Sequence, residues 1–428
     1  MTKALTIGLL GLGNVGKGVA DLLQQNAHLL ERRLGHPIRL KTALVRSLNR
    51  VAPPGVHLTT SPDDILDDPD IDVVVEVMGG ENPAFGYISK AIQCGKYVVT
   101  ANKEVISKHK KQLFNLAIHH QVDLFYEAAV GGGIPLIRTL KVGLAANRIE
   151  SIVGILNGTT NYILTQMIDH KMAYRDALTQ AQSLGFAEPD PTMDVSGLDT
   201  AYKLSILASV ALKADIGVTD FVYQGIDTLD SVDISYAVEL GYTIKLLAVG
   251  RLVGDGRLAL SVQPTLLPVD HPLALVRNEY NAIYVLGNAV GESMLMGRGA
   301  GSFPTASAIV SDLIDIAFDL KSTPSNRNLD NEFGEVSVVP RQDMVSQVYL
   351  RLRVHDASGM LAHVGAVFEA HQMSIAQLIQ KEKQDQQAEL VIITHLVSQH
   401  QVQQVRKALL GLEGVTWVSD GLTVGIDS

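Results

Sequence analysis

Hydrophobic residues near the N-terminus occur in short continuous runs, separated by stretches with the period of a helix. The run "ALTIGLL" at Ala4–Leu10 is typical of a strand buried on both faces, and Lys17–Leu30 has a helical period. Similar runs predict four more strands, at Leu40–Val45, Ile71–Val77, Lys96–Thr100 and Asp123–Glu127. Strands that alternate with helices indicate an α/β fold with a parallel, doubly wound sheet.

The alternation changes after residue 145. A strand at Ser151–Leu156 leads into "NGTTNYILTQM", a turn and a helix, and Tyr174–Leu184 predicts another helix. An acidic stretch follows and runs into a helix that ends near Lys213. Three further strands are predicted, at Leu246–Val253, Leu258–Thr265 and Ala282–Gly287. We expect one domain at 1–145, completed by a glycine turn and long helix at 296–320, and a mixed α/β domain at 146–295.

The stretch 321–346 is polar and rich in turn formers, which predicts a linker. After it, "QVYLRLRV" at Gln347–Val354 alternates as a strand with one buried face does. The remaining pattern predicts a helix, two strands, a helix and a strand, at Met360–His371, Ile375–Lys381, Ala388–His395, Gln401–Leu410 and Val415–Val424. This βαββαβ order predicts a ferredoxin-like domain at 347–428.

Composition narrows the class of protein. The formal net charge is −10 and no block of lysine and arginine is present, which argues against nucleic acid as a partner. The one cysteine, Cys94, permits no disulfide within the chain, as is usual in a reducing cytoplasm. No uninterrupted apolar run reaches the roughly 18 residues that a membrane span needs, so no membrane partner is expected.

The first predicted strand is followed by a G-x-G-x-x-G turn and then by a helix. In a dinucleotide site of the Rossmann type, the first glycine makes the turn, the second admits the pyrophosphate and the third lets helix and strand pack closely. The predicted cofactor-binding residues of this turn are Gly11, Gly13, Asn14, Val15 and Gly16. The alternative is a glycine turn that merely joins two elements.

Arg46 stands at the end of the second predicted strand, where an NAD-binding protein usually has a carboxylate for the ribose 2′-hydroxyl. An arginine there suits a 2′-phosphate, which favours NADP over NAD. The alternative is that Arg46 lies in solvent at the end of the strand and binds no cofactor.

Four carboxylates precede a single lysine in "GFAEPDPTMDVSGLDTAYKL", at Glu188, Asp190, Asp194 and Asp199 before Lys203. One interpretation is local: Ser196 and Asp199 form a capping box, and Asp199 and Lys203 are an i, i+4 pair. The other is a substrate site, in which carboxylates hold a substrate ammonium and the lysine gives a proton to a carbonyl that accepts hydride. The local interpretation does not account for Glu188, Asp190 and Asp194, and neither interpretation gives Asp190 a role.

Several motifs together resemble the homoserine dehydrogenase family. They are "NGTTNYIL" at 157–164, the acidic block at 185–204 and "GAGSFPTASAIVSDL" at 299–313, with "VEVMGG" and "VTANKEVIS" in matching order. The tail from Tyr349 to Gln380 resembles an ACT domain. The resemblance implies NAD(P)H-dependent, reversible reduction of L-aspartate 4-semialdehyde to L-homoserine, in threonine and methionine biosynthesis. It also implies that the domain at 146–295 is catalytic and forms a dimer contact.

The resemblance implies roles for individual residues. Lys203 matches the proton donor, Glu188 and Asp199 match residues that bind homoserine, and Asp194 matches a further acidic position. Lys103 matches a catalytic lysine where nicotinamide and substrate meet, and its alternative is a solvated loop charge. Gly185 and Gly301 match positions near the cofactor. A site for a hard monovalent cation such as sodium is implied at Glu127, Val130, Gly132 and Ile134. The alternative is a plain turn between a strand and a loop.

The ACT resemblance implies an amino-acid effector, threonine in this family, and a homodimer or homotetramer. Two positions depart from the usual pattern: Ser358 replaces the proline before Gly359, and Met373 stands where an effector-binding turn more often has asparagine. The ACT unit could therefore serve in assembly. Two rival functions are an amino-acid sensor on a degenerate enzyme body, and an aspartate-semialdehyde dehydrogenase with Cys94 as nucleophile.

Overall fold

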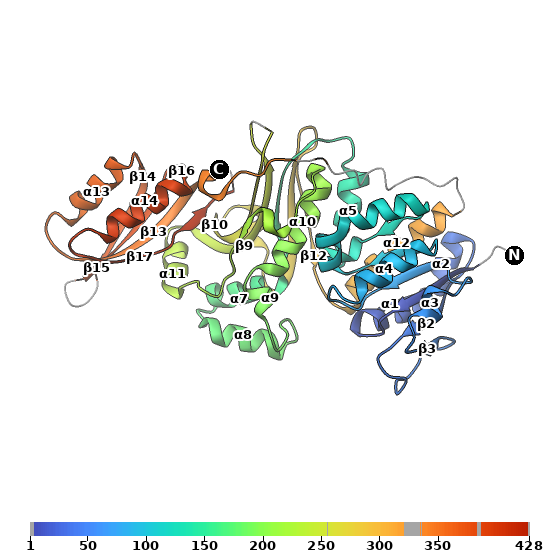
Figure 1. The fold of residues 1–428 in the computed structure, drawn as a ribbon. Coiled ribbons are helices and arrows are strands. Elements are labelled where there is room, and N and C mark those ends of the chain that lie inside the picture. Colours follow the sequence, from blue (N-terminus) through green and yellow to red (C-terminus); the bar gives the residue numbers. More distant parts are fainter. Residues whose placement is uncertain (1–3, 255, 321–333, 335, 383–386, 427–428) are drawn as a thin grey trace. The chain divides into compact units, whose positions relative to one another are not determined.

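The computed structural model describes residues 4–254, 256–320, 334, 336–382 and 387–426 (Figure 1). The chain forms two compact units. The first comprises Met1–Ile152, Ala201–Asp220 and Tyr280–Val336, and the second comprises Val153–Thr200, Phe221–Glu279 and Ser337–Ser428. Most of the predicted linker, at 321–333 and 335, lies outside the described residues. No helix in the described part of the chain is long and apolar enough to cross a membrane.

The first unit is built on a parallel sheet in the order β3-β2-β1-β4-β5-β6. Its strands are β1 (Leu5–Leu10), β2 (Ile38–Leu44), β3 (His57–Thr59), β4 (Val73–Glu76), β5 (Tyr97–Thr100) and β6 (Leu124–Phe125). The strand order reverses between β1 and β4, which pair in parallel with Leu9 opposite Val75. Ligands of such sheets bind at the carboxyl ends of strands beside this point. The predicted α/β fold class is confirmed.

Helices cover both faces of this sheet. They are α1 (Asn14–Gln25), α2 (Ala27–Leu34), α3 (Asp63–Leu66), α4 (Ala84–Gln93), α5 (Lys103–His120) and α12 (Ser302–Asp319). The single helix predicted at Lys17–Leu30 is wrong, because Asn26 ends α1 and begins α2. Helix α12 returns from late in the sequence, and its Ile309 and Leu313 join the core around Ile7 of β1.

Shorter elements complete the first unit. They are a 3₁₀ helix (Glu127–Ala129), α6 (Leu136–Arg138), a π-helical turn (Thr139–Gly143) and a 3₁₀ helix (Val218–Asp220). Strands β11 (Tyr280–Gly287) and β12 (Gly291–Arg298) form an antiparallel hairpin. Strand β7 (Ile149–Ile155) and helix α10 (Leu198–Leu212) run across the division of the chain between the units.

The second unit contains two long antiparallel strands, β9 (Tyr242–Leu252) and β10 (Leu258–Pro268), with the short β8 (Val222–Tyr223) beside β10. Its helices are α7 (Gly158–Asp169), α8 (Tyr174–Ser183), α9 (Thr192–Val195) and α11 (Ser231–Glu239), with a 3₁₀ turn at Pro272–Leu275. Residues Thr159 to Met167 of α7 are all buried, the polar ones included. A buried helix needs partners for those polar groups. They come from the backbone of the helix itself, from Lys245 of a neighbouring strand and from the loop at Val276 and Asn278.

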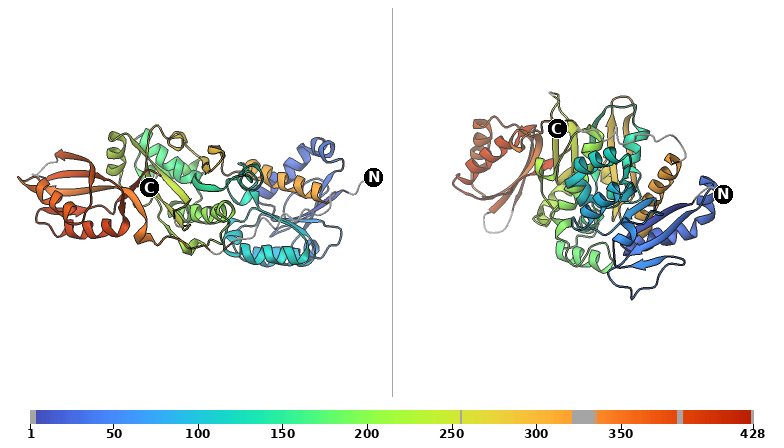
Figure 2. Two further views of the ribbon diagram at one scale, coloured as in Figure 1. Left: turned by 90° about the horizontal axis from the view of Figure 1, so that it is seen from above. Right: turned by 45° about the vertical axis from the view of Figure 1, so that its right-hand side comes forward.

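The C-terminal part of the second unit has the βαββαβ order. Its elements are β13 (Val345–His355), α13 (Met360–Ala370), β14 (Ile375–Glu382), β15 (Gln387–Thr394), β16 (Val397–Ser398), α14 (Gln399–Leu410), β17 (Val415–Val418) and β18 (Leu422–Val424), after a 3₁₀ turn at Arg341–Asp343. Helices α13 and α14 lie on the same face of the sheet that these C-terminal strands form (Figures 1 and 2). The predicted ferredoxin-like fold is confirmed.

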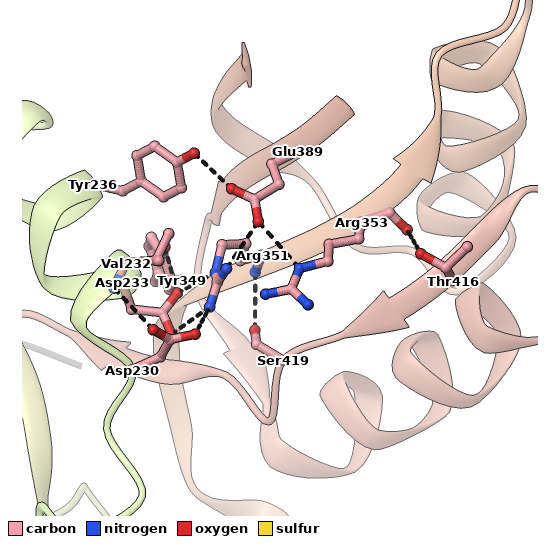
Figure 3. A network of polar contacts seen from close by, with 10 residues as sticks. All are labelled: Asp230, Val232, Asp233, Tyr236, Tyr349, Arg351, Arg353, Glu389, Thr416 and Ser419. Carbon is pink, nitrogen blue, oxygen red and sulfur yellow. Dashed lines mark hydrogen bonds and ion pairs between the residues drawn. The ribbon is translucent and has the colours of Figure 1, made fainter. Parts of the chain in front are cut away.

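Two predictions for this region are wrong. The strand predicted at Val415–Val424 is two strands, because Gly421 takes a positive φ of 88° between them. The second strand, β18, pairs with β13 on one side and in parallel with β10 on the other. The predicted exposed face of β13 is also buried: Tyr349 and Arg351 are 0% exposed. Their side chains contact Asp233 of α11, which covers this face (Figure 3).

Candidate active site

The glycine turn lies between β1 and α1, at the carboxyl edge of the parallel sheet. Gly11 has a φ of 103°, a conformation that favours glycine. A Cβ on Gly16 would lie 2.1 Å from the carbonyl oxygen of Gly11, whereas a Cβ on Gly13 would meet no protein atom within 4 Å. Gly16 is therefore required for packing, while the space beside Gly13 is open to a ligand. A site for a dinucleotide pyrophosphate requires both features, a glycine for close packing and a glycine that leaves space for the phosphates.

The start of α12 lies against this turn. Ser302 donates from Oγ to the carbonyl oxygen of Asn14 at 2.6 Å, and a Cβ on Gly18 would come within 2.4 Å of Ser302 Oγ. Gly301, with a φ of 119°, is the residue before this helix. The structure thus brings Gly301 to the glycine turn from almost 300 positions away in the sequence.

Arg46 is exposed just after β2, as the sequence predicts for a residue beside the ribose. The structure adds Arg50, which sequence reasoning missed. Its Nη1 donates to the carbonyl oxygen of Leu12, within the glycine turn, at 2.7 Å. Two guanidinium groups therefore follow β2 on the loop beside the turn, and one of them fixes the backbone between Gly11 and Gly13.

Lys103 is held at the carboxyl ends of β4 and β5. Asn102 caps α5 by accepting from the Val105 N–H, and donates from Nδ2 to Gly80 at 2.7 Å. Thr100 donates to the buried carboxyl group of Glu76 at 2.6 Å. Burial raises the pKa of Glu76, against the effect of the donors from Thr100 and Met78. This buried network, which sequence reasoning missed, sets the position of Lys103 as the first residue of α5.

Lys203 is 9% exposed and lies on α10, one helical turn after Asp199. The helix packs against α5 through a buried contact between Ser205 Oγ and Ser107 Oγ at 2.5 Å. Ser107 is in turn one helical turn after Lys103. The structure therefore places the two predicted catalytic lysines on helices that are in contact.

Asp194 and Asp199 are brought together by the start of α7. Asn157 donates from Nδ2 to Asp194 Oδ1 at 2.7 Å and to Asp199 Oδ2 at 2.8 Å. Thr159 Oγ1 lies 3.0 Å from Asp194 Oδ2 and 2.7 Å from the carbonyl oxygen of Phe186. Asp199 is 1% exposed. Sequence reasoning recognised the motif around Asn157 but assigned no role to either side chain.

The other residues of the acidic loop have different surroundings. Asp190 accepts from the backbone N–H of Thr192 at 3.1 Å and from its hydroxyl at 2.6 Å, and these bonds lower the pKa of Asp190. It therefore shapes the turn into α9. Glu188 is exposed, and the side chain of Gln182 donates to its carbonyl oxygen at 3.2 Å. Gly185, with a φ of 76°, follows α8.

The predicted capping box is wrong. Ser196 ends α9 in a helical conformation, with φ −75° and ψ −11°, whereas an N-cap residue has an extended backbone. Helix α10 starts only at Leu198. Asp199 lies in its first turn, where the helix dipole favours a negative charge.

Glu127, Val130, Gly132 and Ile134 form one tight turn after β6. The Glu127 carboxyl group accepts from the N–H groups of Ile137 at 2.8 Å and Arg138 at 2.7 Å, and the carbonyl oxygen of Ile134 accepts from the Leu136 N–H at 2.8 Å. Burial raises the pKa of Glu127, and burial together with Glu127 raises that of Asp312, which accepts from the Glu127 N–H at 3.1 Å. Two buried carboxyl groups, of Glu127 and Asp312, thus lie at this turn.

Three family models match the chain: homoserine dehydrogenase at 135–314, its NAD binding domain at 11–127 and the ACT domain at 348–414. A homoserine dehydrogenase of Bacillus subtilis (strain 168) is 41% identical over 418 residues, 96% of each chain. The crystal structure of a homoserine dehydrogenase from Thiobacillus denitrificans has a TM-score of 0.94 and 39% identity, and the match covers 99% of this chain and 98% of that one. The chain belongs to the homoserine dehydrogenase family.

A hyperthermophilic archaeal homoserine dehydrogenase in complex with NADPH also matches, with a TM-score of 0.63 and 27% identity over 74% of this chain and 98% of its own. As a homoserine dehydrogenase family member with a matching NAD binding domain, this chain is an oxidoreductase that uses a nicotinamide cofactor. These findings favour the enzyme over the amino-acid sensor. They also disfavour an aspartate-semialdehyde dehydrogenase, and Cys94 lies exposed at the end of α4.

The ACT domain of this homoserine dehydrogenase family member departs from the usual effector turn in a specific way. Gly359 precedes α13 with a φ of 90°, so the tight turn survives without a proline. Met373 is 4% exposed and belongs to the hydrophobic core of the domain. Met373 thus packs inside the domain as an apolar core side chain.

Proposed function

We propose that this chain catalyses the reversible reduction of L-aspartate 4-semialdehyde to L-homoserine, with NADPH preferred, in threonine and methionine biosynthesis. The observation that carries the proposal is α10, which holds Asp199 and Lys203 one turn apart with 1% and 9% of their surfaces exposed. The cofactor supplies the hydride for the aldehyde carbon. Lys203 protonates the carbonyl oxygen, and its ammonium stabilises the developing alkoxide.

The acidic residues hold the amino-acid substrate in this proposal. Glu188 and Asp199 bind the amino-acid end and the hydroxyl group, and Asp194 adds a second charge beside Asp199. Charge-assisted hydrogen bonds to an ammonium group are strong and directional, which suits a small substrate. Lys103 acts where the nicotinamide and the substrate meet, and Gly185 and Gly301 lie near the cofactor.

The preference for NADP rests on the loop after β2. Arg46 is exposed there, Arg50 is bonded to the glycine turn, and no carboxylate stands at the ribose position of the sequence. Guanidinium groups bind phosphates with two parallel hydrogen bonds. The match to an archaeal family member in complex with NADPH supports the same preference.

A monovalent cation, sodium in the first instance, is proposed at the turn of Glu127, Val130, Gly132 and Ile134. Backbone carbonyls suit a hard cation. A cation there would also offset the buried carboxyl groups of Glu127 and Asp312, whose pKa values are raised by burial.

For the ACT domain we propose a role in assembly of a homodimer or homotetramer, with threonine as the effector to be tested. The domains are proposed as 1–145 with 296–320, 146–295, a linker at 321–346 and 347–428. A single exposed cysteine fits a reducing cytoplasm.

The test is a set of initial rates with aspartate semialdehyde and either NADPH or NADH, with and without threonine, and with sodium or a bulky organic cation. We expect faster turnover with NADPH and a rate that depends on sodium. Oxidation of neither cofactor would overturn the assigned reaction. An undiminished rate in excess threonine would rule out threonine as the effector, and assembly would be the one proposed role of the ACT domain.

A further inference from the structure

Asn157 is a buried residue for which the reaction as described has no role. It is 4% exposed and is the N-cap of α7, where its Oδ1 accepts from the Thr160 N–H at 2.8 Å. Its Nδ2 donates to both Asp194 and Asp199, at 2.7 and 2.8 Å. The network determines the orientation of the amide, because the opposite orientation would turn its oxygen toward two carboxylates.

The uncharged amide of Asn157 holds the two carboxyl groups close together. Both carboxylate oxygens lie within hydrogen-bond distance of the same nitrogen, although two carboxylates repel one another. An asparagine has two N–H donors on one nitrogen and no charge. A lysine or arginine at this position would cancel the negative potential that a substrate ammonium requires, and a serine has only one donor.

The frame behind Asn157 is fixed as well. Asn161, one turn further along α7, donates to the carbonyl oxygen of Asn278 at 2.8 Å and accepts from the buried ammonium of Lys245 at 2.9 Å. Thr159 lies within 3.0 Å of the second oxygen of Asp194. Asn161 thus fixes α7 to Asn278 and Lys245. Asn157, on the same helix, fixes the two carboxyl groups.

We propose that Asn157 is the positioning residue of the amino-acid end of the substrate site, where it holds the side chains of Asp194 and Asp199 together so that one substrate ammonium can bridge them. The inference rests on the proposed function. It assigns to Asn157 no contact with the reacting atoms.

The test compares Asn157→Asp with Ser398→Ala by steady-state homoserine oxidation. Asn157→Asp keeps the shape and the oxygen that caps α7, but it removes both N–H donors and adds a charge. Ser398→Ala removes the cap of α14, where Ser398 accepts from the Gln401 N–H at 3.2 Å, far along the chain from the acidic loop. It therefore reports what the loss of a helix cap does by itself.

For Asn157→Asp we expect the KM for homoserine to rise tenfold to a hundredfold, as the loss of hydrogen bonds to charged groups implies. The KM for NADP should stay within twofold, and Ser398→Ala should leave both constants within twofold. A wild-type KM for homoserine in Asn157→Asp would overturn the inference. So would an equal rise in both KM values, because that pattern indicates a general loss of structure.

A second readout does not depend on activity. In Asn157→Asp with Asp194→Asn, the amide and the carboxylate exchange places and their hydrogen bond can form again. The Tm of the double variant should exceed that of Asn157→Asp alone. No recovery would overturn the inference. A wild-type protein that fails to oxidise homoserine would instead count against the proposed function, which separates the two failures.

Discussion

Arg351 of β13 donates from Nε to Oδ1 of Asp233 on α11 at 2.7 Å, and its side chain is fully buried. The same guanidinium donates to Asp230 at 2.5 Å and to Glu389 at 3.0 Å (Figure 3). It also lies 4.8 Å from the centre of the Trp417 ring. The open face of the ACT sheet is therefore closed by a polar network and not by apolar packing. Such a network determines how two elements fit together, because each charge needs its partner.

Arg351→Met should destabilise the chain by about 3 to 5 kcal/mol, because it leaves carboxylates buried without their cation. The matched control is Arg353→Met, on the same strand. Arg353 also lies near the Trp417 ring, at 5.1 Å, and also bonds Glu389, at 3.2 Å, but 44% of its side chain is exposed. Its loss should cost about 1 kcal/mol or less. Urea unfolding of the three proteins measures both values. Equal effects would contradict the importance of burial at Arg351.

The glycine turn separates packing from ligand binding. Gly16→Ala should lower the stability, because its Cβ would lie 2.1 Å from a backbone oxygen of Gly11. Gly13→Ala should fold normally and bind NADPH at least tenfold more weakly, since its methyl group would occupy the space left for the pyrophosphate. Thermal unfolding and fluorescence titration with NADPH distinguish the two. Tight NADPH binding by Gly13→Ala would show that the cofactor lies elsewhere.

Lys203→Ala should lose turnover by a factor of about 10² to 10⁴, the usual contribution of a general acid, while the Kd for NADPH stays near that of the wild type. The control Lys407→Ala removes an exposed lysine of α14 in the ACT domain and should be fully active. Stopped-flow kinetics measures the turnover rate, and titration with NADPH measures its Kd. Normal turnover in Lys203→Ala would remove the proposed role of this residue.

Lys245 predicts a pH dependence of stability. Burial, with Arg277 nearby, lowers the pKa of Lys245 from 10.5 to about 8 in the folded chain. Below pH 8 the lysine is protonated in both states, and the folded state bears the full cost of a buried charge. Between pH 8 and 10.5 only the unfolded state keeps the proton, so stability rises with pH relative to Lys245→Met, by about 1 kcal/mol per unit. Urea unfolding at pH 7, 8, 9 and 10 measures this difference, and a constant difference would contradict the prediction.

Arg46→Ala should raise the KM for NADPH about tenfold and leave that for NADH nearly unchanged, because only NADPH has the 2′-phosphate. Initial rates with both cofactors provide the comparison. An equal effect on the two cofactors would place the 2′-phosphate away from Arg46.

The sequence by itself determined the fold class, the glycine turn, the ACT unit and the family. Each of these depends on residues that are close together in the sequence. The signals are continuous apolar runs, hydrophobic periods of two or of 3.6 residues, and motifs of neighbouring residues. Only the tertiary structure decided which groups meet from distant positions. Alternation along β13 predicts a second face, but whether α11 or water covers it depends on residues more than a hundred positions earlier. The motif that contains Asn157 was visible from the start, whereas the two carboxylates that share its amide became neighbours only when α7, α9 and α10 packed together.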